Sequence, residues 1–363
     1  MKRILHIVSI MDRAGQETLI MNLYRNINRE KIQFDFLCTW NRKGDYDDEI
    51  ISLGGTIHHL PQNTTNLKFI KYFSNFFIIR KYLSQLSYDT IHIHNYHAFS
   101  SLTWVWAAKC AGIKNIILHS HNTSAPHKSL HKICRPLLKL FKIRRLACSK
   151  DASEWMFGTR DAKIILNGIV PETFKFDQSS RESIRIQLGL GNSTVITHVG
   201  RFNFQKNHIF LIEIFKEYLR INPNSKLLLI GKGELENEIR DQINTLGISD
   251  KVLFLGIRED IPAILSASDL FLFPSLFEGL SVVLVEAQAT GIPIMTNQNL
   301  AEETLFADNA LGLSIDDSPS SWAQKINKTI CSGRNKDALK NIVEHGFDIS
   351  ITATEMQNYY LSL

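Results

Sequence analysis

Short apolar runs alternate with helix-like patterns along nearly the whole chain. In the first half these runs are ILHIVSI at 4–10, QFDFLCTW at 33–40, DTIHIH at 89–94, NIILHSH at 115–121, IRRLACS at 143–149 and KIILNG at 163–168. In the second half they are TVITHVGR at 194–201, KLLLIGKG at 226–233, KVLFLG at 251–256, DLFLFPS at 269–275 and IPIMTN at 292–297. Strands that alternate with helices are typical of parallel sheets. The pattern therefore predicts an α/β protein with two doubly wound parallel sheets.

A stretch with little periodicity separates the two sets. The sequence GIVPETFKFDQSSRES at 168–183 contains a glycine, a proline and many polar residues, which indicates a linker. We therefore expect a first domain at 1–170, a second domain at 171–345 and a terminal helix at 346–363. Open α/β sheets bind ligands at the carboxyl ends of their strands, so the expected site is a cleft between the domains.

Composition narrows the class of protein. The chain has 363 residues, of which 44% are apolar and 21% charged, as in a globular protein with two cores. The apolar run at 4–11 is short, contains a histidine and is followed by no cleavage signal, so it indicates a buried strand and not a signal peptide. The five cysteines have no paired or metal-like spacing. We expect reduced thiols in a cytoplasmic protein.

Charge divides unevenly between the halves. Residues 1–170 hold 24 Lys and Arg against 12 Asp and Glu, whereas residues 171–363 hold 17 against 24. A basic first half suits an anionic membrane surface or a phosphate-bearing partner. Within it, residues 128–145 interleave cations with Leu, Ile and Phe, as in a segment that docks on an anionic leaflet. A packed helix with a solvated basic face is the alternative. We expect no nucleic-acid partner.

Two cations follow the first strand of the second half. That strand ends at Gly200, and Arg201 and Lys206 lie in the loop before an amphipathic helix. Cations beside a helix N-terminus favour an anion, and five residues of loop allow both to reach one diphosphate. The alternative is a solvated loop with two unrelated surface cations.

The next strand runs into Gly231-Lys232-Gly233. Neither a P-loop nor the dinucleotide fingerprint G-x-G-x-x-G is present, which argues against a dehydrogenase. The two glycines permit a close approach of the backbone to a ligand or a plain tight turn.

Two carboxylates follow the strand at 269–275. Glu278 stands on the loop, where we expect its carboxylate to accept from ligand hydroxyls without deep burial. Ser281 is the predicted N-cap of a helix that ends near Thr290, and the free N–H groups near Leu280 and Ser281 favour an anion or a sugar oxygen. For Glu278 the alternative is a surface turn.

Glu286 lies inside that helix among Val, Leu and Ala. A buried carboxylate is costly unless it is paired, and a diol such as a ribose offers it two O–H donors. A structural salt bridge in the core is the alternative.

The first half supplies a glycine and a group of histidines. Gly15, after the first strand, lets the backbone come close to a phosphate. Histidines at 92, 94 and 97 follow one strand, and those at 119 and 121 follow the next. Because residues 90–150 hold no Asp or Glu, we expect no metal site. One or two of the histidines are instead expected to line the cleft, with the rest packed.

Together these pieces resemble the glycosyltransferases of family 4. The segments FEGLS and VEAQATGIP match the E-x7-E motif of that family, with Glu278 and Glu286 at its ends. The match includes AGQE after the first strand, LHSHNTS, ACS, LNGI, GRFNFQKNH and DLFLFPS, and so covers nearly the whole chain. HSHNT is similar to members that build bacterial capsular polysaccharide or exopolysaccharide. The family often has Gly-Gly where this chain has Ala14-Gly15.

The resemblance implies the GT-B fold, in which two Rossmann-like domains face a cleft and the terminal helix crosses back to the first. It implies a retaining hexosyltransferase that needs no metal or other cofactor and uses a nucleotide-sugar donor, with UDP favoured. A lipid-diphosphate-linked or saccharide acceptor would bind mainly to the first domain. The enzyme would be cytoplasmic, peripheral on the membrane.

Residue roles follow by position from the same resemblance. Arg201 and Lys206 would neutralise the diphosphate, Glu286 would bind the ribose, and Glu278 and His121 would contact the sugar. The remaining donor-binding positions would be Gly15, Gly200, Gly231, Gly233, Gly279, Leu280 and Ser281.

The expected chemistry requires no metal ion. Breaking a glycosyl–phosphate bond places negative charge on the diphosphate, which fixed cations and helix N–H groups stabilise. No D-x-D motif ends a strand, and the leaving phosphate itself would deprotonate the acceptor. Two rivals stay open: a sugar-nucleotide epimerase and a non-catalytic nucleotide-sugar scaffold protein. The sugar, the base, the acceptor and the linkage are not fixed by the sequence.

Overall fold

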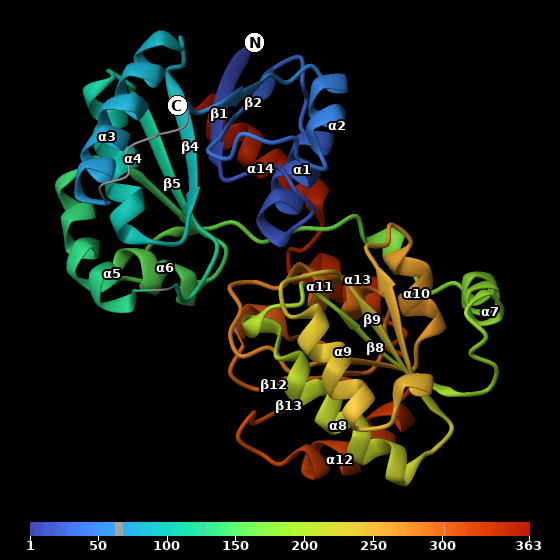
Figure 1. Cartoon of the computed structure of the whole chain (residues 1–363). Coiled ribbons are helices and arrows are strands. Elements are labelled where there is room, and N and C mark those ends of the chain that lie inside the picture. The colour runs from blue at the N-terminus through green and yellow to red at the C-terminus, as the bar shows by residue number, and fades with distance from the viewer. Residues whose placement is uncertain (62–67, 126, 301) are drawn as a thin grey trace. The chain divides into compact units, whose positions relative to one another are not determined.

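The protein consists of two compact units. The computed structural model describes residues 1–61, 68–125, 127–300 and 302–363 (Figure 1). The first unit contains residues 1–168 and 349–363, and the second contains residues 169–348.

The first unit is built on a seven-stranded parallel sheet with the order β3-β2-β1-β4-β5-β6-β7. Its strands are β1 (Lys2–Val8), β2 (Ile32–Cys38), β3 (Ile57–His59), β4 (Thr90–Asn95), β5 (Asn115–Ser120), β6 (Arg144–Ala147) and β7 (Lys163–Ile164). The strand order reverses between β1 and β4. Such a switch point is where open α/β sheets leave a ligand crevice.

Helices complete this unit. They are α1 (Gly15–Asn26), α2 (Asp47–Ser52), α3 (Lys68–Gln85), α4 (Ala98–Cys110), α5 (Lys128–Cys134), α6 (Lys150–Phe157) and α14 (Ile349–Leu361), with a 3-10 helix at Arg135–Leu140. The C-terminal helix α14 packs against α1 (Figure 1). Tyr360 of α14 is fully buried beside Phe34, with ring centroids 5.7 Å apart. The expected terminal helix that returns to the first sheet is confirmed.

The second unit has a six-stranded parallel sheet with the order β10-β9-β8-β11-β12-β13. Its strands are β8 (Thr194–Val199), β9 (Ser225–Ile230), β10 (Val252–Gly256), β11 (Leu270–Phe273), β12 (Ile294–Asn297) and β13 (Ala310–Leu313). Here the order reverses between β8 and β11, so the switch point lies between their carboxyl ends.

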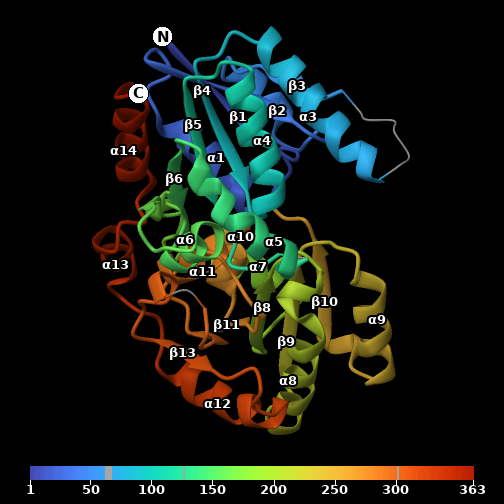
Figure 2. The same cartoon turned by 90° about the vertical axis from the view of Figure 1, so that its left-hand side faces the viewer.

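Seven helices of at least six residues occur in the described part of this unit. They are α7 (Gln178–Gln187), α8 (His208–Ile221), α9 (Glu236–Thr245), α10 (Ile261–Ala267), α11 (Val282–Ala289), α12 (Pro319–Cys331) and α13 (Ala338–Glu344). Short 3-10 helices lie at Pro171–Phe174, Phe204–Lys206, Ser249–Lys251 and Glu302–Thr304. Figure 2 shows α8 beside α12, and their contact covers one face of the sheet with Phe215 and Trp322 in its core.

The two doubly wound parallel sheets are confirmed, with two local differences. The short strands β3 and β13 were not predicted from the sequence, because β3 (IHH) holds a single apolar residue and the apolar run of β13 (ALGL) is interrupted by a glycine. The predicted linker at 168–183 already contains a 3-10 helix and the start of α7, which Asp177 caps by accepting from Ser180 N. No helix in the described ranges is both long and apolar enough to cross a membrane.

Candidate active site

An ion pair connects the two strands at the switch point of the second unit. Lys206, in the loop after β8, places its Nζ 2.7 Å from Oε1 of Glu278, in the loop after β11. Gln205 Nε2 donates to Oε2 of the same carboxylate at 3.1 Å, and Leu276 N donates to Gln205 O at 2.9 Å. The two loops are therefore fixed to each other where ligands of such sheets bind.

Two asparagines shape the loop that carries Lys206. Asn203 Oδ1 accepts from Lys206 N at 3.2 Å, and Asn207 adopts a left-handed conformation with φ of 55°. Asn207 Nδ2 also donates to Pro274 O at 3.2 Å. The Lys206 ammonium lies 4.5 Å from the ring centre of Phe273, a cation–π contact. Short polar side chains thus hold the cation in place over the end of β11.

Glu278 is more buried than its position on a loop indicated. Its side chain is 8% exposed, so the expectation of a carboxylate without deep burial is wrong, and so is the alternative of a surface turn. The physical reason is that Lys206 and Gln205 compensate the carboxylate inside the protein.

Arg201 stands apart from this pair. Its side chain is 69% exposed and its Nη2 lies 3.2 Å from Glu234 Oε2. Lys206 and Arg201 come from one loop, as expected, but each has its own carboxylate partner. This ion pair is exposed and therefore weak, so the guanidinium can turn toward an anion.

Glu286 lies in the second turn of α11 with a partly exposed side chain. Burial raises the pKa of its carboxyl to about 7. Within the described ranges no ion pair or hydrogen bond to this carboxylate is found, so the structure does not show the alternative of a salt bridge in the core.

Ser281 occupies the N-cap position of α11, but its side chain makes no capping hydrogen bond. Gly279, Leu280 and Ser281, which precede the helix, are buried.

Two glycines of this unit allow neighbouring loops to approach each other closely. Gly231 has φ of +136°, and a Cβ there would lie 2.1 Å from Gly200 O. A Cβ on Gly233 would lie 2.2 Å from Phe202 O. The loops after β8 and β9 therefore approach each other closely only because these residues lack side chains. By contrast, a Cβ on Gly15 in the first unit would meet nothing within 4 Å.

Next to Gly15, the sequence analysis missed a buried carboxyl. Glu17, in the first turn of α1, is 9% exposed, and burial raises its pKa to about 7. Gln16 Nε2 donates to its Oε1 at 3.1 Å. A charged residue two positions after a glycine gave no signal that its side chain turns inward.

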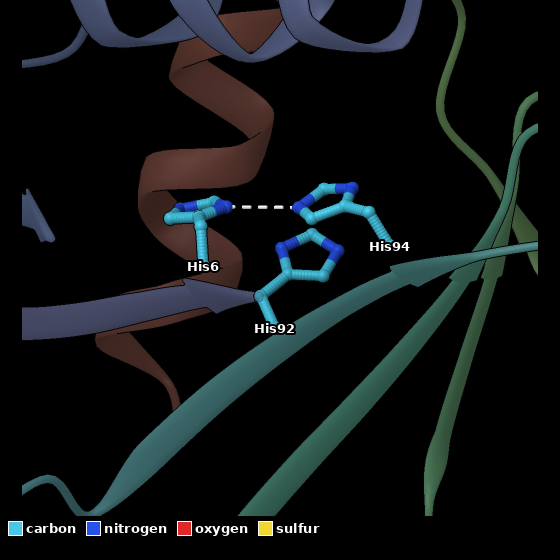
Figure 3. Close-up of side chains that lie close together, drawn as sticks. All are labelled: His6, His92 and His94. Atoms are coloured by element: carbon cyan, nitrogen blue, oxygen red, sulfur yellow. Dashed lines mark hydrogen bonds between the residues drawn. The ribbon is translucent and has the colours of Figure 1, made fainter. Parts of the chain in front are cut away.

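Five histidines of the first unit form one cluster. His94 Nδ1 lies 2.8 Å from His121 Nε2, and His92 Nε2 lies 3.2 Å from His119 Nδ1. His6 of β1 joins them, with its Nδ1 2.9 Å from His94 Nε2 (Figure 3). The sequence analysis missed His6, although it pairs in register with His92 once β1 and β4 are neighbours.

Histidine 97 has a different role. Its Nδ1 accepts from Phe99 N at 3.2 Å and caps α4.

Burial in apolar surroundings lowers the pKa of every ring in the cluster. His6 and His121 reach about 3. All five rings are therefore neutral at physiological pH. Ligand atoms of His6, His92 and His94 lie within 4.8 Å of one another, as do those of His94, His119 and His121. Either group is close enough for a metal ion, but no carboxylate belongs to these groups in the described ranges.

The basic segment of the first unit exposes apolar side chains. In α5 and the 3-10 helix after it, His131, Cys134 and Leu138 are buried. Ile133 is 71% exposed and Leu140 is 78% exposed. The exposed cations around them are Lys128, Lys132, Lys139, Lys142 and Arg144.

Comparison with known proteins identifies the class. The family model described as Glycosyltransferase Family 4 matches residues 13–172, and the one described as Glycosyl transferases group 1 matches residues 180–345. The putative glycosyltransferase EpsF of Bacillus subtilis is 32% identical over 99% of this chain and 96% of its own length. The chain therefore belongs to the family 4 glycosyltransferases and is an enzyme of that class.

Two further similarities concern the fold and more distant relatives. The UDP-Gal:α-D-GlcNAc-diphosphoundecaprenol α-1,3-galactosyltransferase of Escherichia coli is 26% identical over 99% of this chain and 97% of its own length. The structure of HepE of Anabaena in complex with UDP-glucose matches with a TM-score of 0.81 at 20% identity and full coverage of both chains. The likeness to HepE confirms the GT-B fold.

Proposed function

We propose that the protein is a retaining hexosyltransferase that moves a hexose or N-acetylhexosamine from a UDP-sugar to a lipid-diphosphate-linked or saccharide acceptor in surface polysaccharide biosynthesis. The observation that carries the proposal is the Lys206–Glu278 pair at the switch point of the second sheet. It sets a cation and a hydroxyl acceptor side by side at the place where an open α/β sheet binds ligands.

Each expected residue receives a role in this proposal. Lys206 and Arg201 stabilise the charge that develops on the diphosphate as the glycosyl bond breaks. Glu278 accepts from sugar hydroxyls, and Glu286 accepts from the two ribose hydroxyls.

Glycines and amides complete the proposed donor site. Gly231 and Gly233 keep the loop of the cations in shape, since a Cβ on either would collide with backbone. A Cβ on Gly200 would lie 3.1 Å from the side chain of Lys206, so this glycine leaves room for the cation. The N-terminal turn of α11, after Gly279, Leu280 and Ser281, offers amide donors to the donor's oxygens. In the first unit, Gly15 leaves open space next to the start of α1 for a phosphate, and His121 contacts the sugar.

The relatives support the choice of substrates. EpsF-like members and the E. coli galactosyltransferase align over nearly the whole chain, and the latter, by its name, uses UDP-Gal and a diphosphoundecaprenol-linked sugar. HepE, with the same fold, binds UDP-glucose. We propose by analogy a UDP-sugar donor and an acceptor on a lipid diphosphate.

The exposed basic and apolar segment at 128–145 suits such an acceptor. Its apolar side chains insert into a leaflet while the surrounding cations contact anionic headgroups. We propose that this segment docks the cytoplasmic enzyme on the inner face of the membrane.

Thermal-shift binding tests the donor site. The full chain is titrated with UDP, ADP, GDP and their sugar conjugates in the presence of EDTA. A ligand that binds the native state raises its apparent stability, so UDP and at least one UDP-sugar should raise the Tm without a divalent ion. Lys206→Met should abolish the shift, whereas Lys340→Met, which removes an exposed pair on α13, should keep it. No shift with any nucleotide overturns the proposed donor site.

A turnover measurement separates the remaining candidates. Transfer of labelled sugar to a lipid-diphosphate-linked acceptor supports the proposal. Binding of a UDP-sugar without transfer to any lipid-linked or saccharide acceptor would identify a scaffold protein, and conversion of the sugar without an acceptor would identify an epimerase.

A further inference from the structure

Three histidines of the first unit are joined end to end by hydrogen bonds. His6 Nδ1 lies 2.9 Å from His94 Nε2, and His94 Nδ1 lies 2.8 Å from His121 Nε2. The close-up shows the first of these bonds, with the rings of His6 and His94 edge to edge (Figure 3). We call His6, His94 and His121 the imidazole chain. It runs from β1 through β4 to the residue that follows β5.

The number of N–H groups limits how the imidazole chain can be protonated. Burial lowers the pKa of all three rings far enough to keep them neutral, so each carries one N–H. Two of the three protons lie in the two hydrogen bonds. The third must therefore lie at an end of the chain, on His6 Nε2 or on His121 Nδ1. Both atoms are buried and without a hydrogen-bond partner in the described ranges.

The two ends differ in what can reach them. His6 is fully buried among Phe34, Phe36 and Tyr360. His121 is partly exposed as a residue, although its Nδ1 is itself buried. An N–H enclosed without an acceptor is rarer and costlier than an acceptor left without a donor. This favours a bare nitrogen at the His6 end and the N–H at the His121 end.

Nearby charges do not reverse this preference. Among the residues that the structure describes, Asp35 is the carboxylate whose charge acts on His6. Arg3 Nε donates to its Oδ2 at 2.6 Å and Tyr88 Oη donates to the same oxygen at 2.8 Å. With its charge compensated in this way, Asp35 attracts a proton to His6 only weakly.

We propose that His6 and His94 are positioning residues that lock His121 in the Nδ1–H tautomer, so that His121 donates a hydrogen bond to a hydroxyl oxygen of the donor sugar. His6 Nδ1–H donates to His94 Nε2, which leaves the proton of His94 on Nδ1. His94 Nδ1–H then donates to His121 Nε2, which leaves the proton of His121 on Nδ1. The sugar contact of His121 rests on the proposed function, whereas the tautomer does not.

A metal ion in the cluster is the competing arrangement. Two ligands of a tetrahedral zinc ion lie about 3.3 Å apart, which is not far from the nitrogen separations seen here. An ion at His6, His92 and His94 would, however, bring a double charge into the interior with neutral ligands only. A stoichiometric transition metal in the purified protein that disappears in His94→Gln would overturn the hydrogen-bonded chain.

Nitrogen NMR of the full chain labelled with ¹⁵N-histidine tests the tautomer directly. The chemical shift separates a protonated from an unprotonated ring nitrogen, and single histidine variants assign the signals. We expect Nδ1 of His121 to be protonated and its Nε2 to be bare. The opposite assignment would overturn the proposal, and this outcome requires no knowledge of the donor.

Matched variants test the role of His6. His6→Asn keeps an N–H donor near His94 and should keep the His121 tautomer, whereas His6→Leu removes the donor and should give mixed tautomers. His58→Asn is the control, since His58 contacts Tyr88 and lies outside the chain. An unchanged His121 tautomer in folded His6→Leu would show that His6 does not set it and would overturn the proposal.

Binding separates this effect from general damage to the protein. With UDP-glucose as the probe, His6→Leu should bind about tenfold more weakly, the scale of one hydrogen bond. Affinity for UDP should be unchanged, because UDP has no sugar for His121 to contact. Equal losses for UDP and UDP-glucose would contradict the proposal. A failure of wild type to bind either probe would instead refute the proposed donor while leaving the NMR result intact.

Discussion

The ammonium of Lys206 lies 2.7 Å from the carboxylate of Glu278 and joins the carboxyl ends of two strands that are neighbours only because the sheet order reverses there. The side chains are 15% and 8% exposed. Each charge therefore depends on the other for compensation. We propose that Lys206 contacts the leaving diphosphate and that Glu278 contacts the sugar.

Removal of one member of this pair should cost stability as well as activity. Lys206→Met leaves Glu278 buried without its cation, which we expect to destabilise the protein by about 3 kcal/mol. The double variant Lys206→Met with Glu278→Gln removes both charges and should recover most of that loss, since Gln205 can still bond the amide. Turnover should stay at least about 100-fold below wild type in both. Urea denaturation and initial rates measure the two effects.

Arg201→Met is the control for stability. The ion pair of Arg201 with Glu234 is exposed, so the free energy of unfolding should change by less than about 1 kcal/mol, while turnover falls. If the double variant were no more stable than Lys206→Met, the two charges would not compensate each other as described.

Glu286 should make both stability and donor affinity depend on pH. Burial raises its pKa from 4.5 to about 7, so the folded state binds this proton more tightly than the unfolded state. Stability contributed by this group therefore falls as the pH rises from 4.5 to 7. Glu286→Gln removes this titrating group, so its free energy of unfolding at pH 8 should exceed that of wild type by about 1–3 kcal/mol. We expect the lower part of this range, because the side chain is partly exposed.

The same variant should bind the donor more weakly at pH 8. In the proposed donor site ionised Glu286 accepts from both ribose hydroxyls, so the donor affinity of wild type should rise with pH through about 7 and that of Glu286→Gln should not. Because Glu17 also has a pKa of about 7, the measurement is the difference between variant and wild type across the pH range. Parallel curves for the two proteins would exclude Glu286 as the titrating group.

Much of the fold could be read from the apolar pattern. Parallel strands buried on both faces give continuous apolar runs, such as LFLF in β11 and LLLI in β9, which stand out from their surroundings. The E-x7-E spacing located Glu278 and Glu286 for the same reason, since a carboxylate among apolar residues is unusual. The apolar pattern does not predict whether a residue on a loop is buried. It therefore could not show that Gln205 and Lys206 cover Glu278.

His6 shows the second limit of the sequence. A lone histidine in an apolar strand is more often a packed side chain than part of a site. Only the strand order, which places β1 beside β4, brings His6 to His94. That order depends on contacts between residues some 90 positions apart in the chain, which local periodicity does not encode.

The backbone conformation at position 231 should require a glycine. With φ of +136° and Gly200 O 2.1 Å from any Cβ, Gly231→Ala demands a shift of the loop that carries Arg201 and Lys206. We expect a loss of at least about 2 kcal/mol in unfolding free energy. Gly15→Ala is the matched control, because a Cβ there meets open space, and its stability should equal that of wild type. Equal thermal stability of the two variants would contradict the described close approach.

Membrane docking should depend on the exposed apolar side chains of the basic segment. The double variant Ile133→Asp with Leu140→Asp places charge at two positions that are 71% and 78% exposed, so the fold should be unaffected. We expect wild type to sediment with phosphatidylglycerol vesicles and less so as salt rises, because anionic headgroups attract the cations of the segment. The double variant should lose this binding.

Ile186→Asp supplies the matched control, since Ile186 is 82% exposed on α7 of the second unit and lies outside the basic segment. It should sediment with the vesicles as wild type does. Neutral phosphatidylcholine vesicles should retain none of the three proteins, because insertion of two apolar side chains alone is too weak to hold a 41.5 kDa chain. Equal binding to neutral and anionic vesicles, or equal losses in Ile186→Asp and the double variant, would show that residues 128–145 do not dock the enzyme.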